Sequence, residues 1–436
     1  MNAKILIISL LIASGTSAQE PLRIDAAGAV EVALQNSERL REARNALEQA
    51  KANRKVARAA YLPNFAGSAT TGWSLPDTKY PDMGITLRMR GLYMAGINLQ
   101  QPIFAGGKIV AANKLAGIGA EAAAQQLRQT EIAVRAEAET AYWTYVAVRA
   151  KEEMMVSYAA LVDTAYRQTL ASVDAGMATR NDLLRIEARQ AQVKYQQEQV
   201  SAGAALCLQA LRNALGLDLD TPLEVTDTDV EPVIPADLGV YDLDARPEMA
   251  LLRADVAAKD QQVRLTRGDF LPTLGLQAGW MAYGNIKMNM MTQGPDGNYY
   301  PMEQKISSNG WSIMLSLQVP LFHWGEGYNK VKAAKLDAAN ARLSLQRNRR
   351  GLDLQVQQAI TNVRTGQGLV TSAETAMAQA QTALDSTAES YRYGLANITA
   401  LLDAQSQWQT ARASLIEAKT QLRIHLVDYA AATARL

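Results

Sequence analysis

The sequence predicts a mainly α-helical fold with a smaller number of β-strands. Three observations support this prediction. Long segments without proline are rich in alanine, glutamine and leucine, a composition typical of long helices rather than of one thick globular core. Shorter segments alternate apolar and polar residues, as strands do. The two halves of the chain repeat one plan.

The repeat is clearest where a strand pattern gives way to a helix pattern, at residues 101–107 (Gln-Pro-Ile-Phe-Ala-Gly-Gly) and 319–325 (Val-Pro-Leu-Phe-His-Trp-Gly). A constant offset of 218 positions carries Pro102 onto Pro320 and Gly176 onto Gly394. An offset that stays constant over such a span predicts an internal duplication without net insertions.

Residues 1–18 have the pattern of a secretory signal peptide, with Lys4 before an apolar run and Thr16-Ser17-Ala18 as the cleavage site. A membrane anchor is the alternative, but the apolar run is too short to span a bilayer. The 436-residue chain has a net charge of +1 and no basic patch with interleaved aromatics, which argues against nucleic acid as a partner. The only cysteine, Cys207, excludes an internal disulfide, and we expect it to be a small buried residue.

In the first half, residues 19–61 predict a leading helix with Asp25 as its N-cap, ending before Pro63. Residues 62–104 predict a strand pair, at about 64–80 and 87–104. Residues 105–217 predict a long helical hairpin that turns at Gly176. Its first helix, 107–174, would be on the order of 100 Å long at about 1.5 Å per residue, several times the roughly 30 Å of a bilayer core.

The second half repeats this order after a linker. Residues 218–245 are rich in aspartate and proline and predict a linker between the two halves, with a short strand at 223–225. Residues 246–270 predict a second leading helix. Residues 271–322 predict a second strand pair, at about 273–291 and 309–322, joined by a turn-rich segment at 293–298. Residues 323–436 predict a second long hairpin, broken at Gly394.

One strand pattern suggests a membrane. An apolar side is predicted for Trp311, Ile313, Leu315, Leu317 and Val319, and the residues between them are small or polar, apart from one methionine. Such alternation fits a lipid-facing barrel strand with a wet lumen, although an ordinary half-buried strand in a soluble sheet has the same pattern. Four strands cannot close a barrel, and lipid does not tolerate an open sheet edge. Either the strands pack on a soluble core of their own, or several chains share one barrel. Three chains would supply twelve strands.

Taken together and in this order, these features resemble the TolC-type outer-membrane efflux proteins, also called outer membrane factors. The resemblance covers essentially the whole mature chain. It rests on the two strand-to-helix segments, on Leu62-Pro63 and Leu271-Pro272 before the strand pairs, and on the two hairpin turns. It implies a homotrimer in which a twelve-stranded barrel in the outer membrane continues into an α-helical barrel of coiled-coil hairpins across the periplasm.

The resemblance also implies a function. The trimer would be the exit duct of a tripartite efflux or type I secretion system, contacting outer-membrane lipid and docking with a periplasmic adaptor and, through it, an inner-membrane pump. It would be neither an enzyme nor a protein with a cofactor. Two alternatives are a stand-alone porin and a periplasmic coiled-coil scaffold. The long helices argue against a porin, which does not need them, and the apolar strand face argues against a scaffold, which does not explain it.

The hairpin turns, at 175–184 and 391–403, would form the periplasmic tip. Glycine allows the chain to reverse there, and apolar pairs beside it favour a partner surface. The adaptor-contact residues would be Gly176, Leu183, Leu184, Gly394, Leu401 and Leu402.

The resemblance also assigns gate residues. Asp182 and Tyr391 would hold the tip shut, and Asp403 would belong to an acidic ring, although a solvated helix-face carboxylate is the alternative for Asp403. Ala396 and Ala400 replace an arginine and an aspartate of the family pattern. A rebuilt lock would use Arg180 or Arg392.

The sequence predicts no catalytic or metal site. His323 and His425 lie far apart, without carboxylate or thiol partners at ligand spacing, and phosphate-loop and Gly-x-Ser-x-Gly motifs are absent. The methionines at 288–291 have thioethers that can bind Cu(I), but we expect an outer loop without a metal role.

Overall fold

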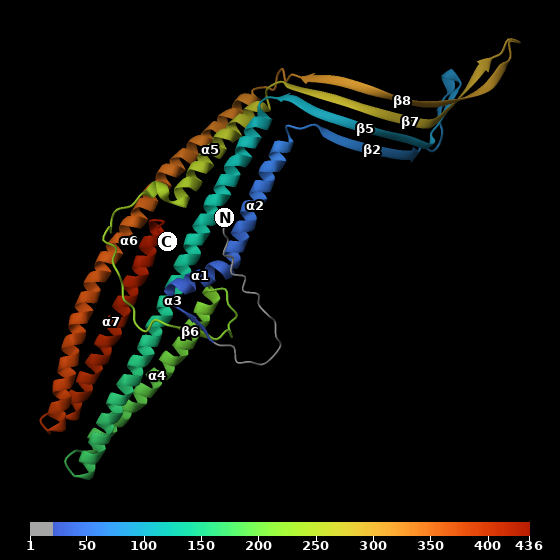
Figure 1. The fold of residues 1–436 in the computed structure, drawn as a ribbon. Coiled ribbons are helices and arrows are strands. Elements are labelled where there is room, and N and C mark those ends of the chain that lie inside the picture. The colour runs from blue at the N-terminus through green and yellow to red at the C-terminus, as the bar shows by residue number, and fades with distance from the viewer. Residues whose placement is uncertain (1–20) are drawn as a thin grey trace, which may run out of the picture. The chain divides into compact units, whose positions relative to one another are not determined.

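The computed structural model describes residues 21–436, so the predicted signal peptide lies outside the described residues. Helices dominate and one antiparallel sheet holds most of the strands, which confirms the mainly helical prediction (Figure 1). The chain divides into two compact units, and each takes segments from both halves of the sequence. Among the described residues, the helical unit comprises 21–42, 128–246 and 350–436, and the sheet unit comprises 43–127 and 247–349.

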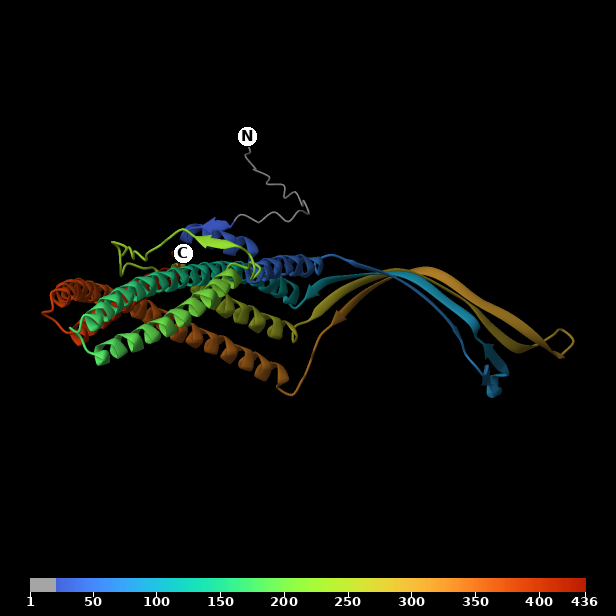
Figure 2. The same cartoon turned by 90° about the horizontal axis from the view of Figure 1, so that it is seen from below.

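The main strands of the sheet unit lie side by side in the order β2, β5, β7, β8 (Figure 1), and Figure 2 shows the same strands from below. Their bounds are Asn64–Trp73, Arg90–Ala105, Thr273–Gln293 and Tyr299–Gln318. All three pairings are antiparallel. Two short strands extend the sheet beside β7: β4 (Ile85–Arg88) pairs with β7, and β3 (Thr78–Tyr80) pairs with β4. Within the described residues, β2 and β8 each pair on one side only.

The strand bounds correct three expectations. The strand expected at 64–80 is divided, because β2 ends at Trp73 and β3 begins at Thr78. The last strand begins at Tyr299 rather than near 309, because a tight turn closes the hairpin: Gly297 is left-handed (φ 80°), and the Gly294 amide donates to the Asn298 carbonyl over 2.7 Å. The methionines at 288–291 therefore lie in strand β7, not in a loop.

The first leading helix is also divided. Asp25 caps α1 (Ala26–Asn36) as expected, because its Oδ1 accepts the Gly28 amide at 2.7 Å. The helix then breaks at Ser37, whose ψ is 120°, and α2 (Glu38–Ala59) begins anew. The Ser37 hydroxyl accepts the Leu40 amide at 3.3 Å, and this local bond competes with helix continuation. The prediction of one continuous helix was wrong. The second leading helix is α5 (Pro247–Gly268).

The long helices form two hairpins. They are α3 (Lys108–Asp174) with α4 (Arg180–Ala214), and α6 (Glu326–Arg392) with α7 (Ile398–Ala432). The longer helix has 67 residues and the shorter has 35 residues in both hairpins. Among the described residues, no helix combines the length and apolar character needed to cross a bilayer.

A small parallel sheet joins the N-terminal segment to the linker. The short strand β6 (Leu223–Val225) lies where the sequence predicted it, and its partner is β1 (Leu22–Ile24), which was not predicted. Behind this sheet, the Tyr142 hydroxyl donates to Asp227 Oδ2 over 2.5 Å. Burial and this bond to a carboxylate raise the pKa of Tyr142, so the hydroxyl remains a donor. A short 3₁₀ turn, Leu243–Ala245, follows in the linker.

Candidate functional site: the turn ends of the helical hairpins

The two hairpin turns have the same backbone hydrogen bonds. Gly176 and Gly394 take left-handed conformations, with φ of 74° and 76°. In each turn, the two amides that follow the glycine donate to one serine carbonyl in the last helical turn, Ser172 in the first hairpin and Ser390 in the second. A side chain at either glycine would be strained, so these positions favour glycine for a structural reason, independent of any partner.

The next helix of each hairpin starts with a side-chain cap, and the two caps differ. Thr179 and Asp182 form a reciprocal capping box: the Asp182 amide donates to Thr179 Oγ1 at 3.2 Å, and the Thr179 amide donates to Asp182 Oδ2 at 3.1 Å. In the second hairpin, Asn397 Oδ1 accepts the Ala400 amide at 2.9 Å, and Ala400 has no carboxylate to reciprocate. The Thr179 side-chain and backbone bonds lower the pKa of Asp182. Its carboxylate therefore serves as a local helix cap.

Two hydrogen bonds tie the first hairpin to the second near these turns. The Tyr391 hydroxyl lies 2.8 Å from Thr169 Oγ1, and Arg185 Nη1 donates to Thr399 Oγ1 over 2.7 Å. The Thr169 hydroxyl donates its single proton to the Ala165 carbonyl at 2.8 Å, so Tyr391 is the donor in the first tie. Neither Thr169 nor Arg185 was singled out by the sequence, because no local pattern marks side chains that meet across more than two hundred residues.

The remaining predicted gate residues are exposed. Arg392 pairs with Glu389 at 3.2 Å within its own helix, and its guanidinium lies over the Tyr393 ring at 5.2 Å. Arg180 begins α4, and Asp403 lies in the second turn of α7. The structure therefore brings Tyr391 together with Thr169 rather than with Asp182.

The predicted adaptor-contact leucines have different environments. Leu184 is 52% exposed and Leu183 is half-buried, whereas Leu401 and Leu402 are only 3% and 8% exposed. Leu401 and Leu402 belong to the apolar cluster around Tyr158 that packs the hairpins together. The expectation of an exposed apolar pair was therefore wrong for the second hairpin, since burial in this cluster is the stronger driving force for two adjacent leucines.

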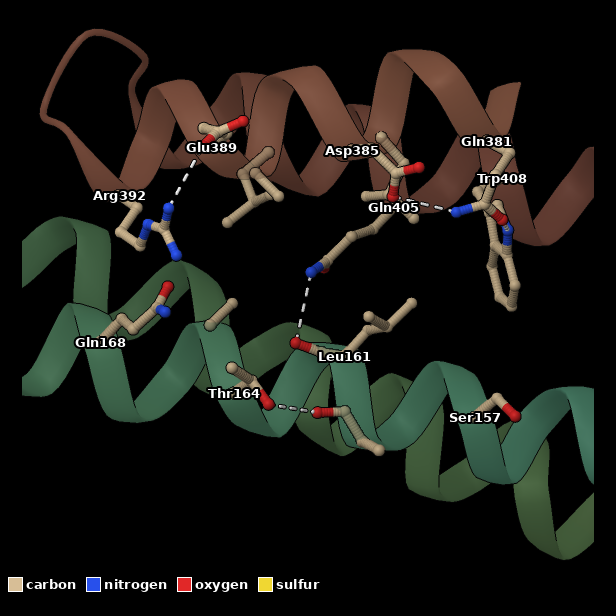
Figure 3. A pocket seen from close by; sticks show the side chains of 15 residues that line it. Ser157, Leu161, Thr164, Gln168, Gln381, Asp385, Glu389, Arg392, Gln405 and Trp408 are labelled. Carbon is tan, nitrogen blue, oxygen red and sulfur yellow. Dashed lines mark hydrogen bonds and ion pairs between the residues drawn. The ribbon is translucent and has the colours of Figure 1, made fainter. Parts of the chain in front are cut away.

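A groove opens between the hairpins just behind the turns, with α3 on one side and α6 and α7 on the other (Figure 3). Its volume is about 730 Å³. Gln405 reaches across it and donates to the Leu161 carbonyl at 3.3 Å. On the opposite wall, the Trp408 indole donates to Gln381 at 2.6 Å, and Gln381 donates to Asp385 at 3.0 Å.

In the sheet unit, the predicted apolar side of the last strand is exposed in the single chain. Trp311 is 82% exposed, and Ile313, Leu315 and Leu317 are also exposed along β8. Val319 is exposed as well but lies just beyond the strand, which ends at Gln318. A surface of large apolar side chains on an edge strand is normally covered by another chain or by lipid.

The side chains with possible metal chemistry are scattered. His323 packs edge-on against Phe270, with ring centroids 6.1 Å apart, and Lys287 pairs with Glu303 at 3.1 Å beside the methionines. Cys207 is half-buried with a free thiol. Within residues 21–436, no group of three or more His, Cys, Asp and Glu side chains is placed to hold a metal ion.

Comparisons with known proteins agree with this architecture. The family model described as "Outer membrane efflux protein" matches residues 29–217 and 242–435. Protein CyaE of Bordetella pertussis is 26% identical over 94% of this chain and 83% of its own length. Outer membrane efflux protein BepC of Brucella suis is 22% identical over 99% of this chain and 91% of its own. The solved CmeC outer membrane channel of Campylobacter jejuni superposes with a TM-score of 0.76 at 20% identity, covering 94% of this chain and 85% of that chain.

Proposed function

Because this chain belongs to the outer membrane efflux protein family, a family of transport channels rather than enzymes, we propose that it is one third of a homotrimeric exit duct. The sheets of three chains form one twelve-stranded barrel in the outer membrane. The hairpins form a helical barrel in the periplasm. An adaptor docks at the hairpin turns and connects the duct to an inner-membrane pump, so the duct itself is passive.

The observation that carries this proposal is the incomplete sheet. Its edge strands β2 and β8 have 10 and 20 residues, and neither has a partner on its outer side among the described residues. Unpaired edges of this length, with apolar side chains such as Trp311 and Phe65 exposed beside them, are not stable in lipid or in water. Pairing β8 of one chain with β2 of the next satisfies the backbone and closes a barrel.

The helical unit supports the same assembly. Large apolar side chains remain exposed along the long helices, including Val156, Tyr195, Leu206, Leu354 and Leu369. Coiled-coil walls bury such side chains against neighbouring helices on both sides. The matching lengths of the two hairpins favour the internal duplication, which would give a trimer six similar hairpins around one axis.

At the periplasmic tip, we assign the closing contacts to residues of both hairpins. Tyr391–Thr169 and Arg185–Thr399 hold one chain's hairpins together, and Asp182 shapes the first turn. Asp403, Arg180 and Arg392 are exposed and available for contacts between chains. Leu184 and the glycine turns face the adaptor.

Cysteine cross-linking tests the shared sheet directly. In a Cys207→Ser background, Phe65→Cys on β2 and a short scan of cysteines along β8 around Leu315 would be oxidised in isolated outer membranes. We expect covalent trimers on non-reducing gels only when both edges carry cysteine, because the bond forms between chains. Each single-cysteine variant is the matched control. If no pair cross-links in correctly localised protein, the shared barrel is refuted.

Two further measurements separate the alternatives. A periplasmic scaffold would be absent from the outer-membrane fraction and would give no heat-labile trimer on unboiled gels. A stand-alone porin would support diffusion without an adaptor, whereas a duct gives drug resistance or protein export only when its adaptor and pump are present.

A further inference from the structure

The groove behind the hairpin turns has the size of a small-molecule site. Its volume, about 730 Å³, lies in the range of roughly 300–1,000 Å³ typical of ligand pockets. It runs along α3 and is closed by α6 and α7 of the same chain (Figure 3). All of its lining residues belong to one chain, so the groove does not depend on the trimer.

The groove is lined by apolar side chains and by hydrogen-bond acceptors. Leu161, Leu384 and Leu401 supply aliphatic surface, and the Trp408 indole supplies an aromatic one. The Trp408 N–H is already used by Gln381. A flat apolar body would therefore bury its surface here without displacing a hydrogen bond of the indole.

One acceptor in the groove is buried and has no partner. Gln405 is 3% exposed, and its Nε2 donates to Leu161, but its Oε1 has no hydrogen-bond partner. An unsatisfied buried carbonyl oxygen costs free energy, and native proteins satisfy such atoms with water or with a ligand. The groove thus offers a specific position for an N–H donor.

The charge of the groove is negative. Asp385 accepts a hydrogen bond from the neutral Gln381 amide, and among the described residues no lysine or arginine lies within ion-pair distance of it. The two other charged residues that line the groove, Arg392 and Glu389, form an ion pair at 3.2 Å and neutralise each other. A ligand with a positive charge would therefore be favoured over a neutral or anionic one.

We propose that this groove binds an amphipathic organic cation with an aromatic body and an N–H group, with Asp385 and Gln405 as the polar contacts and Trp408 and the leucines as the apolar ones. Because the lining residues come from α3 of the first hairpin and from α6 and α7 of the second, the bound cation contacts both hairpins of one chain.

The test uses the full chain in nanodiscs of zwitterionic phosphatidylcholine, with 9-aminoacridine as the probe and empty nanodiscs as the blank. We expect saturable fluorescence anisotropy at one site per chain. Two related molecules separate the contributions: N-methylacridinium keeps the charge but has no N–H group, and neutral acridine lacks both the charge and the N–H group. Each should bind about ten-fold more weakly or worse, since a charge-assisted hydrogen bond is worth at least that factor.

Three variants locate the site. Asp385→Asn and Gln405→Met should each weaken 9-aminoacridine by about ten-fold, and Glu374→Gln, an exposed change on α6 outside the groove, should leave binding unchanged. Circular dichroism melts confirm that the variants are folded. Absence of saturable binding, equal binding of neutral acridine, or equal affinity in all three variants would each overturn the proposal. Because this assay measures binding and not transport, a negative result would not contradict the exit duct, which the cross-linking experiment tests separately.

Discussion

The hydrogen bond between Tyr391 and Thr169 provides the sharpest test of how the hairpin turns are held. Removing it with Tyr391→Phe deletes one hydroxyl and leaves the ring. Thr169 is fully buried, and its hydroxyl keeps its bond to the Ala165 carbonyl in this variant. The variant therefore leaves no buried polar group without a partner, and the loss is that of one hydrogen bond.

The magnitude follows from this geometry. One such bond contributes about 1 kcal/mol, so a single chain loses about a five-fold preference for the tied arrangement. If three chains open together, the loss is about 3 kcal/mol, or roughly 100-fold in the ratio of closed to open tips. Thr169→Val should have a similar effect, and the double variant should add little to either single change.

Single-channel conductance in planar bilayers and the entry of a large antibiotic into whole cells measure the open fraction. We expect longer open times and greater sensitivity for Tyr391→Phe and Thr169→Val. Tyr393→Phe is the matched control, since Tyr393 is an exposed tyrosine in the same turn whose ring lies beside Arg392. If conductance is unchanged in the double variant, this contact does not hold the tip, and the assignment of Tyr391 to the gate fails.

Three other predictions follow from the contacts described above. Asp182→Ala should remove the capping box with Thr179, at a cost of about 1 kcal/mol, and raise conductance; unchanged conductance would remove Asp182 from the gate. Because the pKa of Asp182 is lowered in the folded protein, its contribution to stability is present above about pH 4 and is lost as the pH falls below that value. Trp311→Arg should cost up to about 2–4 kcal/mol, the penalty for an arginine on a lipid-facing side at the membrane midplane, and reduce the trimer on unboiled gels. Ser312→Arg on the other face is the tolerated control, and equal trimer yields would argue against a lipid-facing side. Leu402→Ala should destabilise the helical unit by about 2–5 kcal/mol in a denaturant melt, because Leu402 is buried. The exposed Leu184→Ala should leave the melt unchanged and weaken adaptor cross-linking. A melt that shifts for Leu184→Ala and not for Leu402→Ala would contradict the burial pattern.

The element order was largely predictable from local sequence signals. Proline and glycine end elements through their backbone geometry, so the helix expected at 107–174 appears as Lys108–Asp174, and Gly176 and Gly394 lie in the turns. Asp25 caps its helix through a bond within three residues. The break at Ser37 was missed, because a serine in a helical pattern can either continue the helix or cap a new one.

The candidate site was less predictable, because its contacts join residues far apart in the chain. Asp182 was recognised, but its partner is Thr179 within the same turn, and the partner of Tyr391 is Thr169 on the other hairpin. The burial of Leu401 and Leu402 also depends on which side of α7 faces the first hairpin. A helix pattern shows which residues share a side but not what that side contacts.

The sequence by itself determined the order of strands and long helices, the positions of the turns and the resemblance to a family. These follow from backbone preferences and short-range hydrogen bonds, which act within a few residues. The tertiary structure alone decided that β1 pairs with β6, that Thr169 and Arg185 tie the hairpins, and that Gln405 leaves a buried acceptor in a groove. Those features depend on how two helices or strands from distant segments align, and a shift of one residue in that alignment would exchange every pair of contacting side chains.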